Sequence, residues 1–184
     1  MRAVRLLGPP GALLTVVLGC ASQRLPPPRP AAWQVLESSA CGLRFEMPGA
    51  PQRESDDRPA PGFARSEGYL LTLGVGYAYS VQCDFEPTST GGQAQVNDWL
   101  AERSWQSPAE LMGTRALMLG RCPGRESRIR ISHAGRAVDV VIRRYAPADR
   151  AVVVVATTAD HPTGPEIASR FLESLVIHGC EPAP

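Results

Sequence analysis

The sequence of 184 residues contains no lysine: all 19 basic residues are arginine, and 18 acidic residues nearly balance them. The net charge of +1 lacks the strong basic excess that nucleic-acid-binding proteins show. We therefore expect no nucleic-acid partner. A GC-rich genome explains the use of arginine in place of lysine more simply than a function does.

Residues that commonly perform catalysis are also scarce. The three histidines, His133, His161 and His178, show no helical or hairpin ligand spacing. The sequence has no G-x-S-x-G, H-E-x-x-H or P-loop motif, and its cysteines form no CxxC or zinc pattern. We predict no metal, no cofactor and no enzymatic activity, with a small hydrolase whose site is spread over several loops as the alternative.

The N-terminus has no apolar run long enough to cross a membrane. Leu6–Leu18 spans 13 residues and is interrupted by Pro9 and Pro10, whereas a transmembrane helix needs about 20. With Arg2 and Arg5 in front of it, this run is typical of a secretory signal peptide. We assign residues 1–19 to this signal.

The signal ends in Val17-Leu18-Gly19-Cys20, which resembles the bacterial lipobox. The resemblance implies that Cys20 is lipidated, that the signal is cleaved before it, and that the new amino group is acylated. Several acyl chains anchor a protein stably, since each buried methylene contributes about 0.8 kcal/mol. The alternative is an ordinary secretory signal in which the cysteine occurs by chance.

The residue after Cys20 bears on the destination of the protein. Ala21 stands where enterobacterial lipoproteins retained in the inner membrane carry aspartate. By this similarity we expect an anchor in the outer membrane with the protein facing the periplasm. The inner membrane and the cell surface stay open as alternatives.

Beyond the lipidation site we expect a tether and one domain. Residues 20–32 include the proline-rich stretch RLPPPRP, which predicts a semi-rigid spacer of about 35 Å. Residues 33–184 then form a single globular domain, as their length indicates. Within it, residues 48–62 are rich in proline, glycine and charge and predict a loop.

The strongest strand pattern is YLLTLGVGYAYSVQCDF, residues 69–85, in which large apolar and small residues alternate. This period of two predicts one long strand. Residues 93–105 predict a helix with Val96, Trp99 and Leu100 on one face. The small-residue face of the long strand would accommodate such a helix.

Four further strands are expected at 115–122, 125–133, 136–145 and 151–158, joined by short turns as an antiparallel meander. Residues 151–156, AVVVVA, are apolar at every position and predict a central strand covered on both faces. A capping box of Thr163 and Glu166 begins a helix whose buried face carries Ile167, Phe171 and Leu175, and a strand at 174–178 closes the domain. The predicted fold is α+β, an antiparallel sheet with helices packed on its faces.

Several of these segments resemble a known group of proteins. LRFEMPGAP, CPGRESRIRI, RAVDVVIRRYAP and ASRFLESLVI are similar to segments of uncharacterised secreted bacterial proteins with a PsbP-like α/β/α sandwich, and the likeness spans about residues 43–178. Proteins of this fold are mainly binding and assembly proteins. The resemblance implies the fold and a role of that class.

Four cysteines remain after Cys20 is assigned to lipid, and an even number in an oxidising compartment favours disulfides. In the architecture implied by the resemblance, the first and last strands bring Cys41 and Cys180 to the ends of the domain. Cys83 and Cys122 close successive strands, which are neighbours about two-thirds of the time. Of the three possible pairings, we predict Cys83–Cys122 and Cys41–Cys180.

Arginine is concentrated between residues 125 and 150, where seven arginines face Glu126, Asp139 and Asp149, an excess of 7 − 3 = +4. Strand alternation places Arg128, Arg130 and Glu126 on one face and Ile129 and Ile131 on the other. With Arg143, this face could bind phosphate or carboxylate groups through forked hydrogen bonds. The alternative is a solvated face whose arginines pair with the acidic loop residues Glu54, Asp56 and Asp57.

The sequence therefore favours a lipid-anchored envelope protein that is a non-catalytic binding or assembly module, with the membrane and an unknown envelope protein as its partners. A protein that binds anions or lipid headgroups through the arginine face is the second hypothesis.

Overall fold

The computed structural model describes residues 32–54, 63–74, 76–87, 109–133, 136–147, 149–159 and 163–181, and the statements below concern these. The signal peptide, Cys20, the tether and the helix predicted at 93–105 lie outside them. In these ranges, no helix combines the length and the apolar character needed to span a bilayer.

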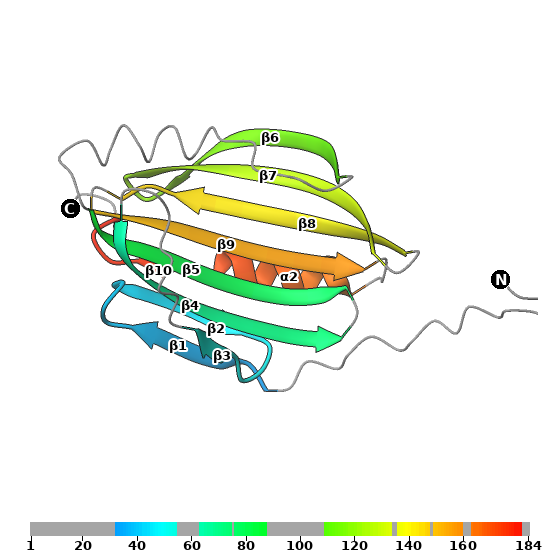
Figure 1. Ribbon diagram of the computed structural model, residues 1–184, viewed down its shortest axis with the longest axis horizontal. Coiled ribbons are helices and arrows are strands. Elements are labelled where there is room, and N and C mark those ends of the chain that lie inside the picture. The colour runs from blue at the N-terminus through cyan, green and yellow to red at the C-terminus, as the bar shows by residue number, and fades with distance from the viewer. Residues whose placement is uncertain are drawn as a thin grey trace, which may run out of the picture.

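A seven-stranded antiparallel sheet forms the body of the domain, with the strand order β3-β4-β5-β9-β8-β7-β6 (Figure 1). The strands are β3 Gln52–Glu54, β4 Phe63–Gly74, β5 Tyr77–Pro87, β6 Ala109–Leu119, β7 Cys122–His133, β8 Arg136–Tyr145 and β9 Arg150–Ala159. The four strands predicted as a meander are confirmed as β6 to β9, and β9 occupies the middle of the sheet as its apolar sequence predicted. Val152 and Val154 of β9 are buried on one face, while Val153 and Val155 are partly exposed on the other.

The single long strand predicted at 69–85 is wrong: the segment is a hairpin of β4 and β5. Gly74 and Gly76 have positive φ angles of 135° and 84° at the turn, a conformation that glycine adopts most readily. Leu71 lies opposite Tyr79 across the hairpin, so residues of the same parity share a face on both strands. The alternation therefore continues through the turn and cannot reveal it.

The loop predicted at 48–62 is also wrong in part, because Gln52–Glu54 form the short strand β3. Arg53 lies opposite Tyr69 of β4. Residues 55–62 of this segment are outside the described residues.

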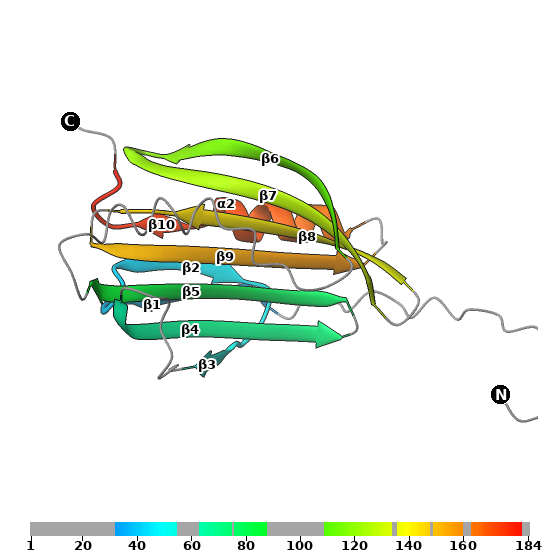
Figure 2. The same cartoon turned by 45° about the horizontal axis from the view of Figure 1, so that its top comes forward.

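A smaller layer covers one face of the large sheet (Figures 1 and 2). It consists of α2, Gly164–Glu173, and a three-stranded sheet in the order β1-β2-β10. Its strands are β1 Gln34–Ser38, β2 Leu43–Met47 and β10 Val176–Ile177. The fold is thus an α+β domain dominated by antiparallel strands, as predicted, and β10 is the predicted closing strand.

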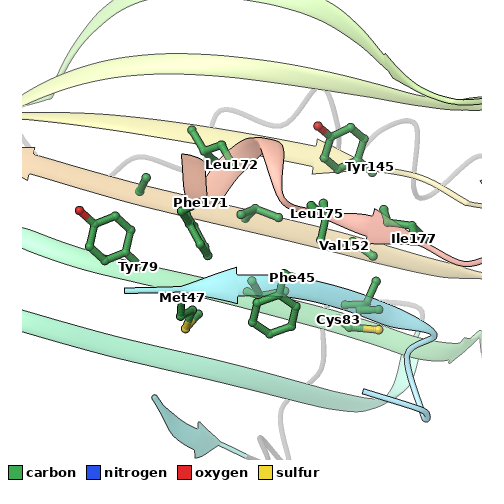
Figure 3. Packing of buried hydrophobic residues seen from close by; sticks show 14 of the residues in the cluster. Phe45, Met47, Tyr79, Cys83, Tyr145, Val152, Phe171, Leu172, Leu175 and Ile177 are labelled. Carbon is green, nitrogen blue, oxygen red and sulfur yellow. The ribbon is translucent and has the colours of Figure 1, made fainter. Parts of the chain in front are cut away.

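The main core lies between the two layers (Figure 3). Phe171 of α2 and Tyr79 of β5 are fully buried and meet edge to face, with 5.3 Å between ring centroids. Phe45 of β2 meets Tyr69 of β4 in the same way, also at 5.3 Å. Phe171 lies on the buried helix face predicted from its spacing. Leu175, predicted on the same face, is also buried, but α2 ends at Glu173 before it. These aromatic contacts join α2 and the small sheet to the large sheet.

The predicted capping box does not form at the start of α2. Thr163 is the N-cap residue, but its side chain makes no capping hydrogen bond, and its backbone is helical at φ −91° and ψ −9°. A capping side chain requires an extended N-cap backbone. Instead, the Ile167 amide donates to the Thr163 carbonyl at 3.2 Å, which extends the helical hydrogen bonding to the cap.

The predicted disulfide pairing is wrong: the bridges are Cys41–Cys83 and Cys122–Cys180, with Cα–Cα distances of 6.2 and 5.2 Å. The prediction assumed that Cys83 and Cys122 close neighbouring strands. In the sheet, however, β9 and β8 separate β5, which carries Cys83, from β7, which begins at Cys122. One bridge joins the small sheet to β5, and the other fastens the C-terminus to the β6–β7 hairpin.

Candidate functional site

The arginines predicted as an anion site do lie together. Arg143 of β8 lies on the face of the large sheet that carries α2, since its Nη1 donates to the Leu172 carbonyl. Arg128 and Arg130 of β7 share this face, because Glu126 lies opposite Arg143 and Arg130 lies opposite Asp139. Ile129 is buried on the opposite face, as strand alternation predicted. The structure thus brings together all three residues of the predicted site.

Glu126 is the centre of this cluster, and its side chain is only 1% exposed. Its Oε1 accepts hydrogen bonds from Arg115 Nε at 2.9 Å and Arg128 Nε at 3.0 Å. Its Oε2 accepts from Arg143 Nε at 2.9 Å and Arg115 Nη2 at 3.0 Å. One buried carboxylate therefore orients three guanidinium groups.

These surroundings lower the pKa of Glu126. Burial raises it, but the hydrogen bonds from Arg115, Arg128 and Arg143 outweigh burial and lower the pKa from 4.5 to about 2. The carboxylate is consequently ionised at neutral pH. Three guanidinium groups against one carboxylate leave 3 − 1 = +2 charges, while Arg130 and Asp139 form a separate pair at 2.8 Å.

The three arginines around Glu126 differ in their exposure. Arg143 is mostly buried, and its Nη1 donates to the carbonyl of Leu172 at 3.1 Å, which fastens the end of α2 to the sheet. Arg128 is 62% exposed and, within the described part of the chain, contacts Glu126 through Nε. Arg115 is also exposed and uses Nε and Nη2. Arg128 and Arg115 are therefore the groups that can donate to a ligand.

The cluster lies in a groove of about 460 Å³ between α2 and strands β7 and β8. Arg128 and Arg143 are on its floor, Pro165 and Ser169 of α2 form one wall, and Met112 of β6 lines it as well. Guanidinium groups that are already oriented by a buried carboxylate lose little entropy when they bind a planar anion. The groove is suited to binding carboxylate or phosphate groups beside an apolar wall.

The alternative partners expected for these arginines are not the ones in the structure. The arginine face pairs with Glu126 and Asp139 of its own sheet, and the side chain of Glu54 lies outside the described part of the structure. Asp56 and Asp57 lie outside the described residues. The face is solvated in part: Arg128 and Arg130 are 62% and 47% exposed, whereas Glu126 between them is buried.

Sequence reasoning missed Arg115 as a member of the cluster. It lies opposite Glu126 in the β6–β7 hairpin. The tight turn at Gly120 and Arg121 could have revealed the contact, because a hairpin register counted outward from that turn places residue 115 opposite residue 126.

The histidines do not enter the groove where the structure describes them. His178 lines a different groove of about 620 Å³ with Arg121 and Arg150, and its Nδ1 lies 3.4 Å from Glu181. The side chain of His133 and all of His161 lie outside the described residues. No group of three or more His, Cys, Asp or Glu side chains converges as metal ligands would in the described ranges.

A second buried carboxylate, Glu67 of β4, has a different environment. It accepts hydrogen bonds from Tyr69 Oη at 2.6 Å, Ser38 Oγ at 2.7 Å and Arg53 Nη2 at 2.8 Å. Burial raises its pKa, but these three hydrogen bonds outweigh burial and lower it. Because Ser38 belongs to β1 and Glu67 to β4, this cluster fastens the small sheet to the large one.

Solved structures of low sequence identity align with this chain. The solution structure of cyanobacterial PsbP (CyanoP) from Synechocystis sp. PCC 6803 aligns with a TM-score of 0.51 and 13% identity over 79% of this chain and 92% of that one. A Bacteroides thetaiotaomicron protein aligns at 0.50 and 10% identity over 79% and 48%. LpqN, involved in cell envelope biogenesis of Mycobacterium tuberculosis, aligns at 0.44 and 17% over 81% and 80%.

No protein-family model and no curated protein matches the chain. The likeness to CyanoP shows a PsbP-like α+β fold, as the sequence resemblance predicted. At this identity the likeness covers the fold alone.

Proposed function

We propose that this protein is a lipid-anchored envelope protein that acts as a non-catalytic binding or assembly module, with the arginine-lined groove as its binding site. The signal-like residues 1–19 and the lipobox-like end at Cys20 support the anchor. Two disulfides fit an oxidising compartment. The outer membrane, with the domain on its periplasmic side, is the location that Ala21 favours.

The observation that carries the binding role is the arrangement around Glu126. One arginine would neutralise the charge of Glu126, yet three guanidinium groups converge here and two are exposed to solvent. The surplus charge lies beside α2 in a groove. This arrangement is suited to acidic side chains of a partner protein, which would complete the hydrogen bonding of Arg115 and Arg128.

The proposal is tested by crosslinking in native envelopes, followed by recovery of the protein and identification of what is bound. Wild type is compared with Cys20→Ala, which removes the anchor, and with Arg128→Gln, which removes one exposed guanidinium. Arg44→Gln is the matched control, because Arg44 is similarly exposed on the small sheet and pairs with Glu37 at 3.7 Å. We expect the same partner with wild type and Arg44→Gln, and a loss of roughly tenfold with Arg128→Gln.

Recovery of that partner at wild-type yield by Arg128→Gln contradicts the groove as the binding site. Recovery at full yield by Cys20→Ala contradicts the need for the anchor. Arg115 and Arg143 still hold Glu126 in the Arg128→Gln variant, so we expect it to fold.

A second candidate function is the binding of phosphate-bearing lipid headgroups in the same groove. Trp33, which directly follows the predicted tether, packs on Arg170 of α2 with the guanidinium carbon 4.0 Å from the ring centroid. The tether therefore joins the domain beside the helix that lines the groove. In co-sedimentation with vesicles, the double variant Arg128→Ser and Arg130→Ser should lose binding to phosphatidylglycerol but not change with neutral phosphatidylcholine. Unchanged binding to phosphatidylglycerol eliminates this candidate.

A further inference from the structure

The two edges of the large sheet are built differently. One edge is β3, a strand of three residues. The other is β6, a strand of 11 residues that pairs only with β7 among the described strands. Figures 1 and 2 show β6 at the margin of the sheet, where it curves with β7 away from the central strands. A long edge strand presents a row of backbone groups that another strand can bind.

β6 is only partly protected as an edge. It has a register shift between Leu111 and Gly113 and carries Glu110 and Arg115, but its sequence, AELMGTRALML, contains no proline, a residue that blocks the approach of another strand. Leu111 and Met118 are 49% and 65% exposed. Large apolar side chains exposed along an edge strand are typical of a protein-binding surface.

The two faces of β6 have different chemistry. Arg115 lies opposite Glu126 and therefore on the groove face, next to the exposed guanidinium of Arg128. Leu111 and Met118 lie opposite Ile129 and Pro123 and therefore on the other face. Glu110 lies opposite Arg130 and so on the groove face too, near the start of β6. A strand added along the later part of β6 would thus have Arg115 and Arg128 on one face and apolar groups on the other.

We propose that β6 is a strand-addition site for an extended segment of an envelope partner in which acidic and apolar residues alternate. This inference rests on the proposed binding function and specifies how the partner is held. The backbone of the added strand would pair with β6, its acidic side chains would contact Arg115 and Arg128, and its apolar side chains would cover Leu111 and Met118. Charge complementarity selects an acidic partner, because a second copy would bring Arg115 towards Arg115.

The test uses the full chain, purified in detergent, and a synthetic peptide about as long as β6 in which glutamate and valine alternate. Hydrogen exchange of the backbone amides is measured by mass spectrometry with and without about 1 mM peptide, which half-saturates a site with a Kd of about 1 mM. We expect exchange across 109–119 to slow by at least about threefold. Residues 34–38 are the matched control, because β1 is an edge strand of the small sheet, and they should not change.

Two variants separate this inference from the proposed function. The double variant Leu111→Asp and Met118→Asp alters the outer face of β6 without touching Glu126 and should abolish the slowing. Replacing Met118 with leucine should retain it. Circular dichroism checks that both proteins are folded.

Each of the following outcomes overturns strand addition. If Arg128→Gln weakens peptide binding but β6 shows no slowed exchange in wild type, the groove binds acidic groups and only strand addition is wrong. If a peptide with all glutamates grouped at one end acts equally well, alternation has no role. If β6 is protected without peptide and gel filtration shows a dimer, the occupant is a second copy.

Discussion

At the scale of single residues, Glu126 explains the groove better than any arginine does. A carboxylate that is 1% exposed costs free energy to bury unless it is paired and hydrogen-bonded. Arg115, Arg128 and Arg143 supply that pairing. The carboxylate also holds their guanidinium groups in place, and the positive charge that it does not neutralise remains at the surface.

The pKa of Glu126 predicts how stability depends on pH. Because the folded-state pKa is lowered from 4.5 to about 2, the stabilisation is present above pH 4.5 and is lost as the pH falls towards 2. We expect Glu126→Gln to reduce the free energy of unfolding by roughly 2–3 kcal/mol at pH 7. Urea unfolding at pH 7, 4 and 2 should show this difference shrinking as the pH falls. A difference that stays constant from pH 7 to pH 2 contradicts the assignment.

A second prediction at this scale concerns Gly120 in the β6–β7 turn. Its φ is +56°, and an added Cβ would meet the Cys180 carbonyl oxygen, since the turn packs directly on that backbone. We expect Gly120→Ala to lower the free energy of unfolding by about 2 kcal/mol or more. Gly113→Ala is the control, because nothing lies within 4 Å of its Cβ position, and it should change stability by less than about 0.5 kcal/mol. Equal unfolding midpoints for the two variants would rule out the close approach.

At the scale of elements, alternation predicted which residues share a face but not where strands turn or which strands are neighbours. Strands β6 to β9 were predicted because each is a separate alternating or apolar segment bounded by turn residues. The β4–β5 hairpin was missed because Leu71 and Tyr79 have the same parity and pair with each other. The order of the sheet depends on long-range pairing, such as that of β5 with β9, which no local pattern encodes.

The prediction at the scale of elements concerns the two disulfides. Tryptic peptides of the unreduced protein should link Cys41 to Cys83 and Cys122 to Cys180 in mass spectrometry. Replacing Cys122 and Cys180 with alanine frees the C-terminus from the β6–β7 hairpin and should cost roughly 2–4 kcal/mol of unfolding free energy. Linked peptides that join Cys83 to Cys122 would refute the strand order, since β5 and β7 are not neighbours.

At the scale of the whole molecule, the sequence predicted the groove arginines Arg128, Arg130 and Arg143 but not their organisation. Strand parity is enough to place them on one face. The burial of Glu126 and the contribution of Arg115 require the hairpin register, and the groove requires α2 to pack on the same side of the sheet. Sequence patterns could therefore identify a cationic face but not the groove.

The anchor predicts a defined N-terminus. Mass spectrometry of protein extracted from membranes should show a chain that begins at Cys20 and carries acyl groups, with residues 1–19 removed. We expect Cys20→Ala to shift the protein from the membrane fraction to the soluble envelope fraction, because no lipid can be attached. An unmodified chain that still begins at Met1 would show that the anchor is absent.

Site-specific photocrosslinking in intact envelopes tests directly whether the arginine-lined groove binds a partner. A photoreactive amino acid is placed at Met112, which lines the groove, or at Val35 on the small sheet, positions with nearly equal exposures of 50% and 52%. We expect a discrete crosslinked partner from position 112, absent from position 35 and lost when Arg128→Gln is added. Equal crosslinking from both positions, or a partner retained with Arg128→Gln, contradicts the claim that the arginine-lined groove is the binding site.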